Sequence, residues 1–344
     1  MRVSYEAISL YSPNRAPCAV DLGDNTNLWG LPPAVRRLME GATDQVITRY
    51  PQAYADDLKR AIAEYVQLPV ECVVTGCGSD DVLDSAIRAF VEPGQLLAYP
   101  DPSFAMVEIF ARMNGLQPVA LPLTDGYDAD AAAFIATDAQ IIYLCSPNNP
   151  TGTALSRRAI ETIVENAPGI VILDEAYAEF ADRDCLDLIR RSDRLVITRT
   201  FSKAFGLAGL RVGYAVATPQ LAREIEKSRG PYKVSCLGAR SAIAALTDNR
   251  QWVNDRVAEA RTARTELTRQ LRQRRLAPLA SQSNFVLAPV ARAADLSARM
   301  RERGVAVRPF PQLTSVGDAI RVTVGPAAMM ERFLTVLDEV LGCE

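Results

Sequence analysis

The chain has 344 residues, of which 49% are hydrophobic and 23% are charged, and its formal net charge is −3. This length exceeds the size at which one hydrophobic core usually keeps growing, so we expect two domains, and the mixed charges argue against a basic face for nucleic acid. The sequence contains no histidine, which excludes a Ser-His-Asp triad, a Cys-His pair and His-ligated zinc and leaves Lys, Asp, Glu, Tyr or Cys as the general base.

The N-terminus and the cysteines predict an unprocessed cytoplasmic protein. Residues 1–6 lack a charged region followed by a long apolar stretch, and no run approaches the roughly 18 apolar residues that span a bilayer. The seven cysteines are scattered and form no CxxC pair, which is typical of reduced thiols. We therefore expect no membrane partner, no nucleic-acid partner and no metal site.

Between about residues 70 and 240, short β-branched runs alternate with helical patterns, which predicts a mostly parallel sheet flanked by helices. The predicted strands are 72–75, 96–99, 118–121, 140–144, 170–173, 195–198 and 211–216. The predicted helices between them lie near 80–91, 103–114, 156–166 and 219–228. Polar motifs follow several of these strands directly, and ligands in open α/β sheets bind beyond the carboxyl ends of the strands.

The C-terminal third predicts a smaller α+β unit. Residues 234–275 have the pattern of one long, charged, amphipathic helix. Predicted strands at 284–287, 305–308 and 319–324, a helix near 293–303 and a terminal helix from about 327 follow it. We expect the large domain to cover 36–245 and the small domain 246–344, with residues 1–35 forming an N-terminal arm and part of the small domain.

Four short segments in the predicted α/β region carry most of the chemical information. They are Ser146-Pro147-Asn148-Asn149-Pro150-Thr151-Gly152, Asp174-Glu175-Ala176-Tyr177, Thr200-Phe201-Ser202-Lys203 and Arg211-Val212-Gly213-Tyr214. Together they provide an amide-bearing turn, a carboxylate, a phenol, a lysine and an arginine. This order and spacing is what a pyridoxal-phosphate site requires.

Lys203 and Asp174 are the candidate catalytic pair. Lys203 precedes an apolar, glycine-rich run, and a desolvated lysine has a lowered pKa and can form an imine, although most lysines are only solvated charges. Asp174 ends a very apolar strand, where a protonated pyridine nitrogen would keep it charged; a helix N-cap is the structural alternative. Tyr177 lies three residues on and can either donate to the ring's phenolic oxygen or simply pack.

Two features predict an anion site for the phosphate. Residues 76–80, Gly-Cys-Gly-Ser-Asp, follow a strand and open a helix, so backbone N–H groups and the positive helix end can cradle an anion. Arg211 adds a forked cation with the hydroxyls of Thr200 and Ser202 nearby, unless it is an ordinary surface arginine. Asn149 presents its amide beyond a strand end, within a sequence that is at least a turn.

Jointly, these motifs resemble the fold-type I pyridoxal-phosphate aminotransferases, and most closely the histidinol-phosphate aminotransferase branch. The resemblance extends from about Asp21 to the C-terminus. The matching segments are 78–81, 146–152, 174–180, 202–214, 231–232, 282–285 and 320–325. The resemblance implies the aspartate aminotransferase-like fold, pyridoxal 5'-phosphate as cofactor, and small-molecule amino donors and 2-oxo acid acceptors as partners.

The same resemblance implies roles for the cofactor-binding residues. Lys203 would hold the cofactor as an imine and later move the proton between substrate and cofactor. Asp174 would pair with the pyridine nitrogen, and Asn149 with Tyr177 would hold the ring's phenolic oxygen. Phe104 falls where the family places a tyrosine stacked on the ring.

The phosphate and the subunit arrangement are also implied by the resemblance. Gly78, Ser79 and Asp80 would contribute to the phosphate site together with Arg211. Tyr50 matches the residue that reaches the phosphate of the neighbouring subunit's cofactor. This match implies an obligate homodimer with shared active sites.

On the substrate side, the resemblance assigns Arg321 to the substrate's anionic group, with Arg308 as a second candidate. Two segments depart from the family pattern. Asn25-Thr26-Asn27-Leu28-Trp29-Gly30 has Trp29 where a tyrosine or phenylalanine is usual, and Tyr232 is followed by a lysine, Lys233, where an asparagine is usual. We expect Asn25, Trp29 and Tyr232 to contact the substrate, whose identity these departures leave open.

We therefore expect a ping-pong transamination, with histidinol phosphate and 2-oxoglutarate as the leading substrate pair in histidine biosynthesis. An aromatic or other amino-acid aminotransferase is the main alternative, favoured by Trp29 and Lys233. A pyridoxal-phosphate decarboxylase of a phosphorylated amino acid would use the same cofactor residues. A non-catalytic binding protein is a further alternative, which an intact Lys203 and Asp174 disfavour.

Overall fold

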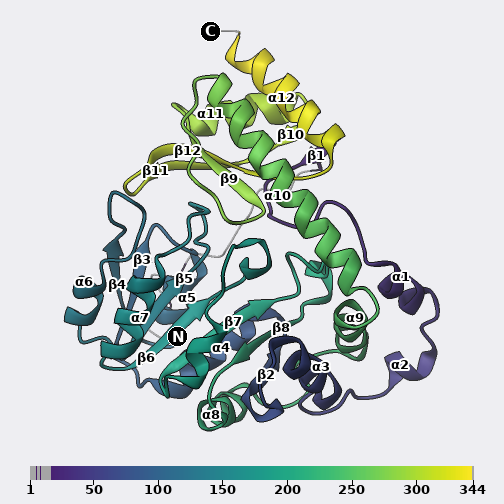
Figure 1. Cartoon of the computed structure of the whole chain (residues 1–344), viewed down its shortest axis with the longest axis vertical. Helices are drawn as coiled ribbons and strands as arrows, with labels where there is room; N and C mark the ends of the chain where they lie inside the picture. Colours follow the sequence, from purple (N-terminus) through teal and green to yellow (C-terminus); the bar gives the residue numbers. More distant parts are fainter. Residues whose placement is uncertain (1–4, 6–7, 9–16, 343–344) are drawn as a thin grey trace.

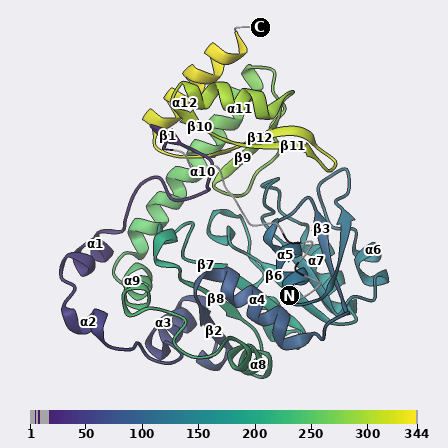
Figure 2. The same ribbon diagram turned by 180° about the vertical axis from the view of Figure 1, so that it is seen from behind.

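The computed structural model describes Tyr5, Ile8 and residues 17–342. Most of the first half of the predicted N-terminal arm therefore lies outside the described residues, as does Cys343. The described chain forms a large lower unit around one sheet and a small upper unit, joined by a long helix (Figures 1 and 2). No helix in the described residues has the length and apolar character needed to cross a membrane.

The large unit is built on a seven-stranded sheet with the strand order β2-β8-β7-β6-β5-β3-β4. Its strands are β2 (Val73–Gly76), β3 (Leu96–Asp101), β4 (Gln117–Pro122), β5 (Ile141–Cys145), β6 (Ile170–Asp174), β7 (Leu195–Thr200) and β8 (Gly213–Val216). All neighbours are parallel except β8, which runs antiparallel to both β2 and β7. The predicted mostly parallel sheet is confirmed.

Helices cover both faces of this sheet, and α1 and α2 pack on α9. The helices of the large unit are α1 (Pro33–Glu40), α2 (Asp44–Thr48), α3 (Asp56–Val66), α4 (Gly78–Phe90), α5 (Met106–Met113), α6 (Ala131–Ala136), α7 (Arg157–Asn166), α8 (Pro219–Arg229) and α9 (Cys236–Leu246). Successive residues of β5 belong to different cores: Ile141 and Tyr143 pack with α4 and α5, whereas Ile142 and Leu144 pack on the α7 side. Because side chains alternate along a strand, burial on both faces requires the continuous apolar runs seen in the sequence.

The small unit contains a three-stranded antiparallel sheet with the order β11-β12-β9 and a two-stranded pair, β1-β10. Its elements are β1 (Val20–Asp21), β9 (Phe285–Pro289), β10 (Val305–Ala306), β11 (Arg308–Leu313), β12 (Gly317–Thr323), α10 (Arg250–Gln273), α11 (Ala293–Glu302) and α12 (Ala327–Leu341). The parallel pairing of β1 with β10 brings the N-terminal segment into this unit. The predicted division into a large domain of residues 36–245 and a small domain of residues 246–344 stays a prediction.

Three predicted elements differ from the structure. The strand predicted over 305–308 is divided into β10, which pairs with β1, and β11, which belongs to the three-stranded sheet. The single helix predicted over 234–275 is wrong, because residues 247–249 separate α9 from α10. These residues are Thr-Asp-Asn, which favour turns, and the Asn249 side chain accepts a hydrogen bond from the Ala34 N–H at 2.7 Å. The strand predicted over 211–216 begins only at Gly213, because Arg211 has a left-handed backbone with φ of 50°.

Candidate active site

The polar motifs meet at the carboxyl ends of three adjacent parallel strands. Residues 146–152 follow β5, Asp174 ends β6, and Lys203 lies three residues beyond β7. Carboxyl ends of neighbouring parallel strands share one edge of a sheet, which is where ligands bind in this fold class. Residues 76–80 join β2 to α4 on the other side of β8 from β7.

Lys203 is a partly buried lysine with a lowered pKa. Its Nζ donates to the Asp24 carbonyl at 3.3 Å and lies 5.7 Å from the centroid of the Tyr177 ring. Burial, followed by the positive charge of Arg321, lowers the pKa of Lys203 to about 8. A large fraction of this amine is therefore unprotonated at mildly alkaline pH, which imine formation and proton transfer both need.

Asp174 is buried at the end of β6 and is held by Tyr143, which was not among the predicted site residues. The Tyr143 hydroxyl donates to Oδ2 at 2.9 Å and the Ala176 N–H donates to Oδ1 at 3.1 Å. Burial nevertheless raises the pKa of Asp174 to about 6. The sequence feature that could have identified Tyr143 is its phenol within the otherwise aliphatic run 141–144, in the strand next to β6. A cationic ligand group at Asp174 would relieve this desolvation.

Tyr177 lies between the two units. Its hydroxyl accepts from Asn25 Nδ2 at 3.1 Å, and its ring meets Phe285 edge to face with centroids 5.2 Å apart. Asn25 has a φ of 55°, and its backbone N–H donates to Thr323 Oγ1 at 3.0 Å. Asn284 Nδ2 in turn donates to the Asn25 carbonyl at 3.0 Å. The small unit thus holds Asn25, a hydrogen-bond partner of Tyr177, in place.

The candidate phosphate site combines a glycine turn with Arg211. Gly78 has a φ of +83°, and a Cβ atom there would lie 2.6 Å from Arg211 Nη2. Arg211 donates to Asp80 Oδ2 at 3.2 Å and to Ser202 Oγ at 3.4 Å. The Ser202 N–H donates to Thr200 Oγ1 at 3.1 Å. The predicted cation, the hydroxyls and the helix start, which also includes Ser79, therefore lie together.

Arg321 and Arg308 form the candidate anion site of the small unit. Arg321 is buried; it donates to Asn149 Oδ1 and, at 2.7 Å, to the Gly23 carbonyl. Its guanidinium lies over the Phe310 ring at 5.5 Å. Arg308 is the direct cross-strand partner of Arg321 in the β11-β12 register, so both side chains leave the same face of the sheet. The predicted role of Asn149 at a ring oxygen stays a prediction.

The remaining predicted residues lie around this centre. Tyr50 is 86% exposed, and its ring lies 5.2 Å from that of the half-exposed Tyr232. Phe104 packs partly buried just beyond β3. Lys233 Nζ forms an ion pair with Asp81 at 3.0 Å, which neutralises the extra charge noted in the sequence. Trp29 lines a groove between α10 and α12 that contains none of the catalytic candidates.

A buried charged cluster lies behind the site and was not predicted. Arg199 contacts Glu175 at 2.6 Å and Asp184 at 2.9 Å. Nearby, Glu179 lines a small cavity of about 130 Å³ with Arg250, and its Oε1 has no hydrogen-bond partner within the described residues. Burial raises the pKa of Glu179 to about 7. This carboxyl is therefore partly protonated near neutral pH.

Comparisons with known proteins agree with this geometry. The family described as "Aminotransferase class I and II" matches residues 18–337. The histidinol-phosphate aminotransferase 2 of Ralstonia nicotianae is 40% identical over 319 residues, covering 89% of this chain and 84% of that protein. The histidinol-phosphate aminotransferase of Methanosarcina mazei is 36% identical over 321 residues, covering 91% and 86%.

A solved structure gives the same picture. The histidinol-phosphate aminotransferase from Sinorhizobium meliloti, in complex with pyridoxal-5'-phosphate, superimposes with a TM-score of 0.89 at 26% identity. The match covers 100% of this chain and 98% of that one. The likeness therefore includes both units and the connections between them.

Proposed function

The chain belongs to the class I and II aminotransferases, and from this premise we propose that it transfers an amino group from histidinol phosphate to 2-oxoglutarate with pyridoxal 5'-phosphate, as a step of histidine biosynthesis. The observation that carries the proposal is the position of Lys203, which lies just beyond β7 with its Nζ 5.7 Å from the centroid of the Tyr177 ring and has a pKa lowered to about 8. Two relatives at 36% and 40% identity that bear the histidinol-phosphate aminotransferase name support the choice of substrate.

The residues present fit the cofactor. Asp174 is a buried carboxyl with a raised pKa, as expected of a group that awaits a cationic partner such as a protonated pyridine nitrogen. Arg211, the Ser202 hydroxyl and the N–H groups that open α4 would hold the phosphate. Asn149 and Tyr177 would hold the ring oxygen. Bound pyridoxal phosphate supplies the electron sink for the negative charge left at the substrate Cα.

Residues of the chain then move the proton of the substrate Cα and stabilise the charge on the cofactor ring. The Lys203 amine takes the proton from the substrate Cα and holds it as an ammonium, which its pKa of about 8 permits near neutral pH. Asp174, as a carboxylate, would stabilise the positive charge of the protonated pyridine nitrogen. Tyr143 and the Ala176 N–H keep that carboxylate oriented through their hydrogen bonds.

Arg308 and Arg321 would select the substrates. Histidinol phosphate ends in a phosphate and 2-oxoglutarate ends in a carboxylate, and a pair of guanidinium forks on one sheet face suits both anions. One anion site would thus serve both halves of a ping-pong cycle. We expect Arg308→Gln to raise KM for histidinol phosphate about tenfold while kcat changes less, since one charged hydrogen bond of the substrate is lost.

We further propose a cytoplasmic homodimer with shared active sites. The exposed aromatic pair Tyr50 and Tyr232, with the exposed Ile47 on α2, supports a subunit contact at this face. The six described cysteines have free thiols, which fits a reducing compartment.

A half-reaction assay tests the proposed function. The reconstituted protein is mixed with single amino donors, and the conversion of the aldehyde to the amine form of the cofactor is followed by absorbance. Histidinol phosphate should react faster than phenylalanine, and Lys203→Ala should lack the imine band that borohydride reduces. Much faster turnover of phenylalanine would replace the proposed substrate, and a reducible imine in Lys203→Ala would remove the lysine assignment.

A further inference from the structure

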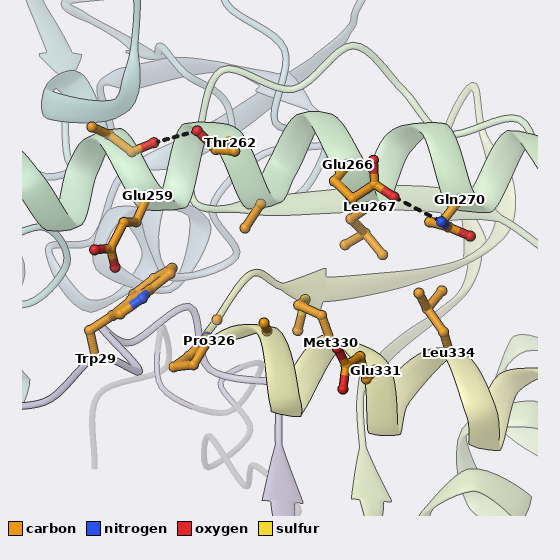
Figure 3. Close-up of a pocket in the computed structure, with 14 residues that line it drawn as sticks. Trp29, Glu259, Thr262, Glu266, Leu267, Gln270, Pro326, Met330, Glu331 and Leu334 are labelled. Carbon is orange, nitrogen blue, oxygen red and sulfur yellow. Dashed lines mark hydrogen bonds between the residues drawn. The ribbon is translucent and has the colours of Figure 1, made fainter.

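A groove of about 720 Å³ lies between α10 and α12, with Trp29 at one end (Figure 3). This volume falls in the range of small-molecule sites, which are typically apolar with a few polar groups. Its walls include Ala263 and Leu267 from α10 and Met330 and Leu334 from α12. Neither Lys203 nor Arg321 lines it, so it is distinct from the candidate active site.

The charged side chains that line the groove are all acidic. They are Glu259 and Glu266 on α10 and Glu331 on α12, and no lysine or arginine is among the described lining residues. Arg269 and Gln270 already occupy both oxygens of Glu266. Arg256 contacts only Oε1 of Glu259. Within residues 17–342, Oε2 of Glu259 and the Glu331 carboxylate accept no hydrogen bond, so two carboxylates have acceptor capacity left.

The Glu259 end of the groove also presents an aromatic ring. Figure 3 shows the Glu259 carboxylate pointing down from α10 toward the Trp29 indole. A carboxylate next to an indole is a combination that binds organic cations, because both the charge and the ring quadrupole attract them. We propose that this groove is a second ligand site, which binds a small organic cation with an apolar body and places the cationic group between Glu259 and Trp29.

The groove is connected to the active site by a short segment. The Trp29 N–H donates to Asn27 Oδ1 at 2.9 Å, and Asn27 Nδ2 donates to the carbonyl of Ala204, the neighbour of Lys203, also at 2.9 Å. Asn25, in the same segment, contacts Tyr177. A ligand that fixes Trp29 therefore acts on groups beside Lys203, and by linkage the amino donor must in turn affect that ligand's affinity.

Benzyltrimethylammonium is a suitable probe because it has an aromatic body and a permanent charge but no N–H, so it cannot form an imine. The chain has two tryptophans, so Trp252→Phe leaves Trp29 as the only indole. Titration of this holoenzyme should give a saturable change in fluorescence with a Kd on the order of 1 mM, from the usual efficiency of a ligand with about eleven heavy atoms. Phenylacetate, with a similar body and a negative charge, should give none.

Matched variants locate the site. Glu259→Gln/Glu331→Gln should weaken probe binding about tenfold, whereas Glu64→Gln, an exposed position on α3 outside the groove, should not change it. Calorimetry on the protein with both tryptophans gives the same comparison if Trp252→Phe fails to fold. No saturation, equal binding of phenylacetate, or unchanged binding in the double variant would overturn the site.

The coupling between the groove and the active site is measured separately, through KM for the amino donor. A saturating concentration of the probe should change KM for the amino donor at least twofold, and the double glutamine variant should abolish this change. An unaltered KM with the probe bound would overturn the link through Asn27. The binding assay needs no turnover, so its failure is distinguishable from failure of the proposed function.

Discussion

Burial shifts the pKa values of Lys203 and Asp174 in opposite directions, and both shifts favour the neutral form of the group. The pKa of the lysine falls to about 8 and that of the aspartate rises to about 6. In both cases the first cause is desolvation, which penalises the charged form. Oppositely shifted pKa values in one site are a common mark of acid-base function.

The Lys203 pKa predicts a pH dependence. Only the unprotonated amine attacks an aldehyde, so the rate at which the apoprotein forms an imine with pyridoxal phosphate should rise about tenfold from pH 7 to 9, with a midpoint near 8. Stopped-flow absorbance measures this rate. Nα-acetyl-lysine is the control and should keep rising to pH about 10. A midpoint above 10 for the protein would contradict the burial argument.

Glu179 predicts a dependence of stability on pH. Its folded pKa of about 7 lies above the unfolded value near 4.3, so the folded state binds the extra proton between these values and loses stability as pH rises through this window. Glu179→Gln should therefore raise the free energy of unfolding by about 1–3 kcal/mol at pH 8 and little at pH 4.5.

Denaturant unfolding at both pH values measures the difference. Glu71→Gln, at an exposed position, is the control and should change neither value. Equal effects of the Glu179 substitution at pH 4.5 and 8 would exclude the proposed titration.

At the scale of elements, the sequence predicted the helices and strands whose residue pattern depends on local rules. All seven large-sheet strands were found, most of them because burial on both faces demands uninterrupted apolar runs such as 170–173, whereas the edge strand β4 is partly exposed. Helices α1 to α3 were not predicted, because they lie in the N-terminal region before the regular alternation begins. The break at 247–249 was missed because Asn249 is satisfied by Ala34, a long-range contact that no local pattern reports.

The site followed the same division. Lys203, Asp174, Arg211 and Ser202 were predicted from strand-end motifs and do lie together as polar groups of one region. Tyr143 could not be predicted, because its role depends on the register of β5 against β6. The strand-end motifs thus predicted which side chains lie together, while their roles stay predictions, and a contact across two strands such as that of Tyr143 was not predicted.

The start of α4 yields a further prediction. Gly78→Ala should weaken pyridoxal-phosphate binding at least tenfold, because the new Cβ would lie 2.6 Å from Arg211 Nη2 and displace the phosphate-binding cation. Gly94→Ala is a matched control, since Gly94 has a similar φ of +93° but open space around it. Both variants should carry a comparable backbone strain of about 1 kcal/mol. Cofactor titration followed by fluorescence would measure the two affinities, and equal losses would assign the effect to strain alone.

At the scale of the whole molecule, the site is assembled from both units. The strands of the large unit supply Lys203 and Asp174, whereas the small unit supplies Arg321 and fixes Asn25 through Thr323. Asn25 and Arg321 come from opposite ends of the chain, and the pairing of β1 with β10 brings the N-terminal segment into the small unit. Relative motion of the two units would therefore change the anion site and the Tyr177 contact together.

The shared-site dimer yields a prediction at the scale of the whole molecule. Tyr50→Phe and Lys203→Ala should each be inactive or nearly so, but their mixture should regain up to about one quarter of the original activity. Half of the mixed dimers pair the two variants, and each of these has one intact site. The assay is transamination after exchange of subunits at low protein concentration. Persistent inactivity of a mixture that demonstrably contains heterodimers would remove Tyr50 from the partner's site.

The helix α10 joins the two units as a single piece of 24 residues, which corresponds to a rod about 36 Å long. One end lies at the turn of residues 247–249, and the other lies in the small unit, where Arg274 pairs with Asp338 of α12 (Figure 1). A rotation of only about 10° at that turn would move the far end by roughly 6 Å, by simple geometry of such a rod. A bend at this turn would therefore shift the small unit, with Arg308 and Arg321, relative to the strand ends of the large sheet that precede Lys203 and Asp174.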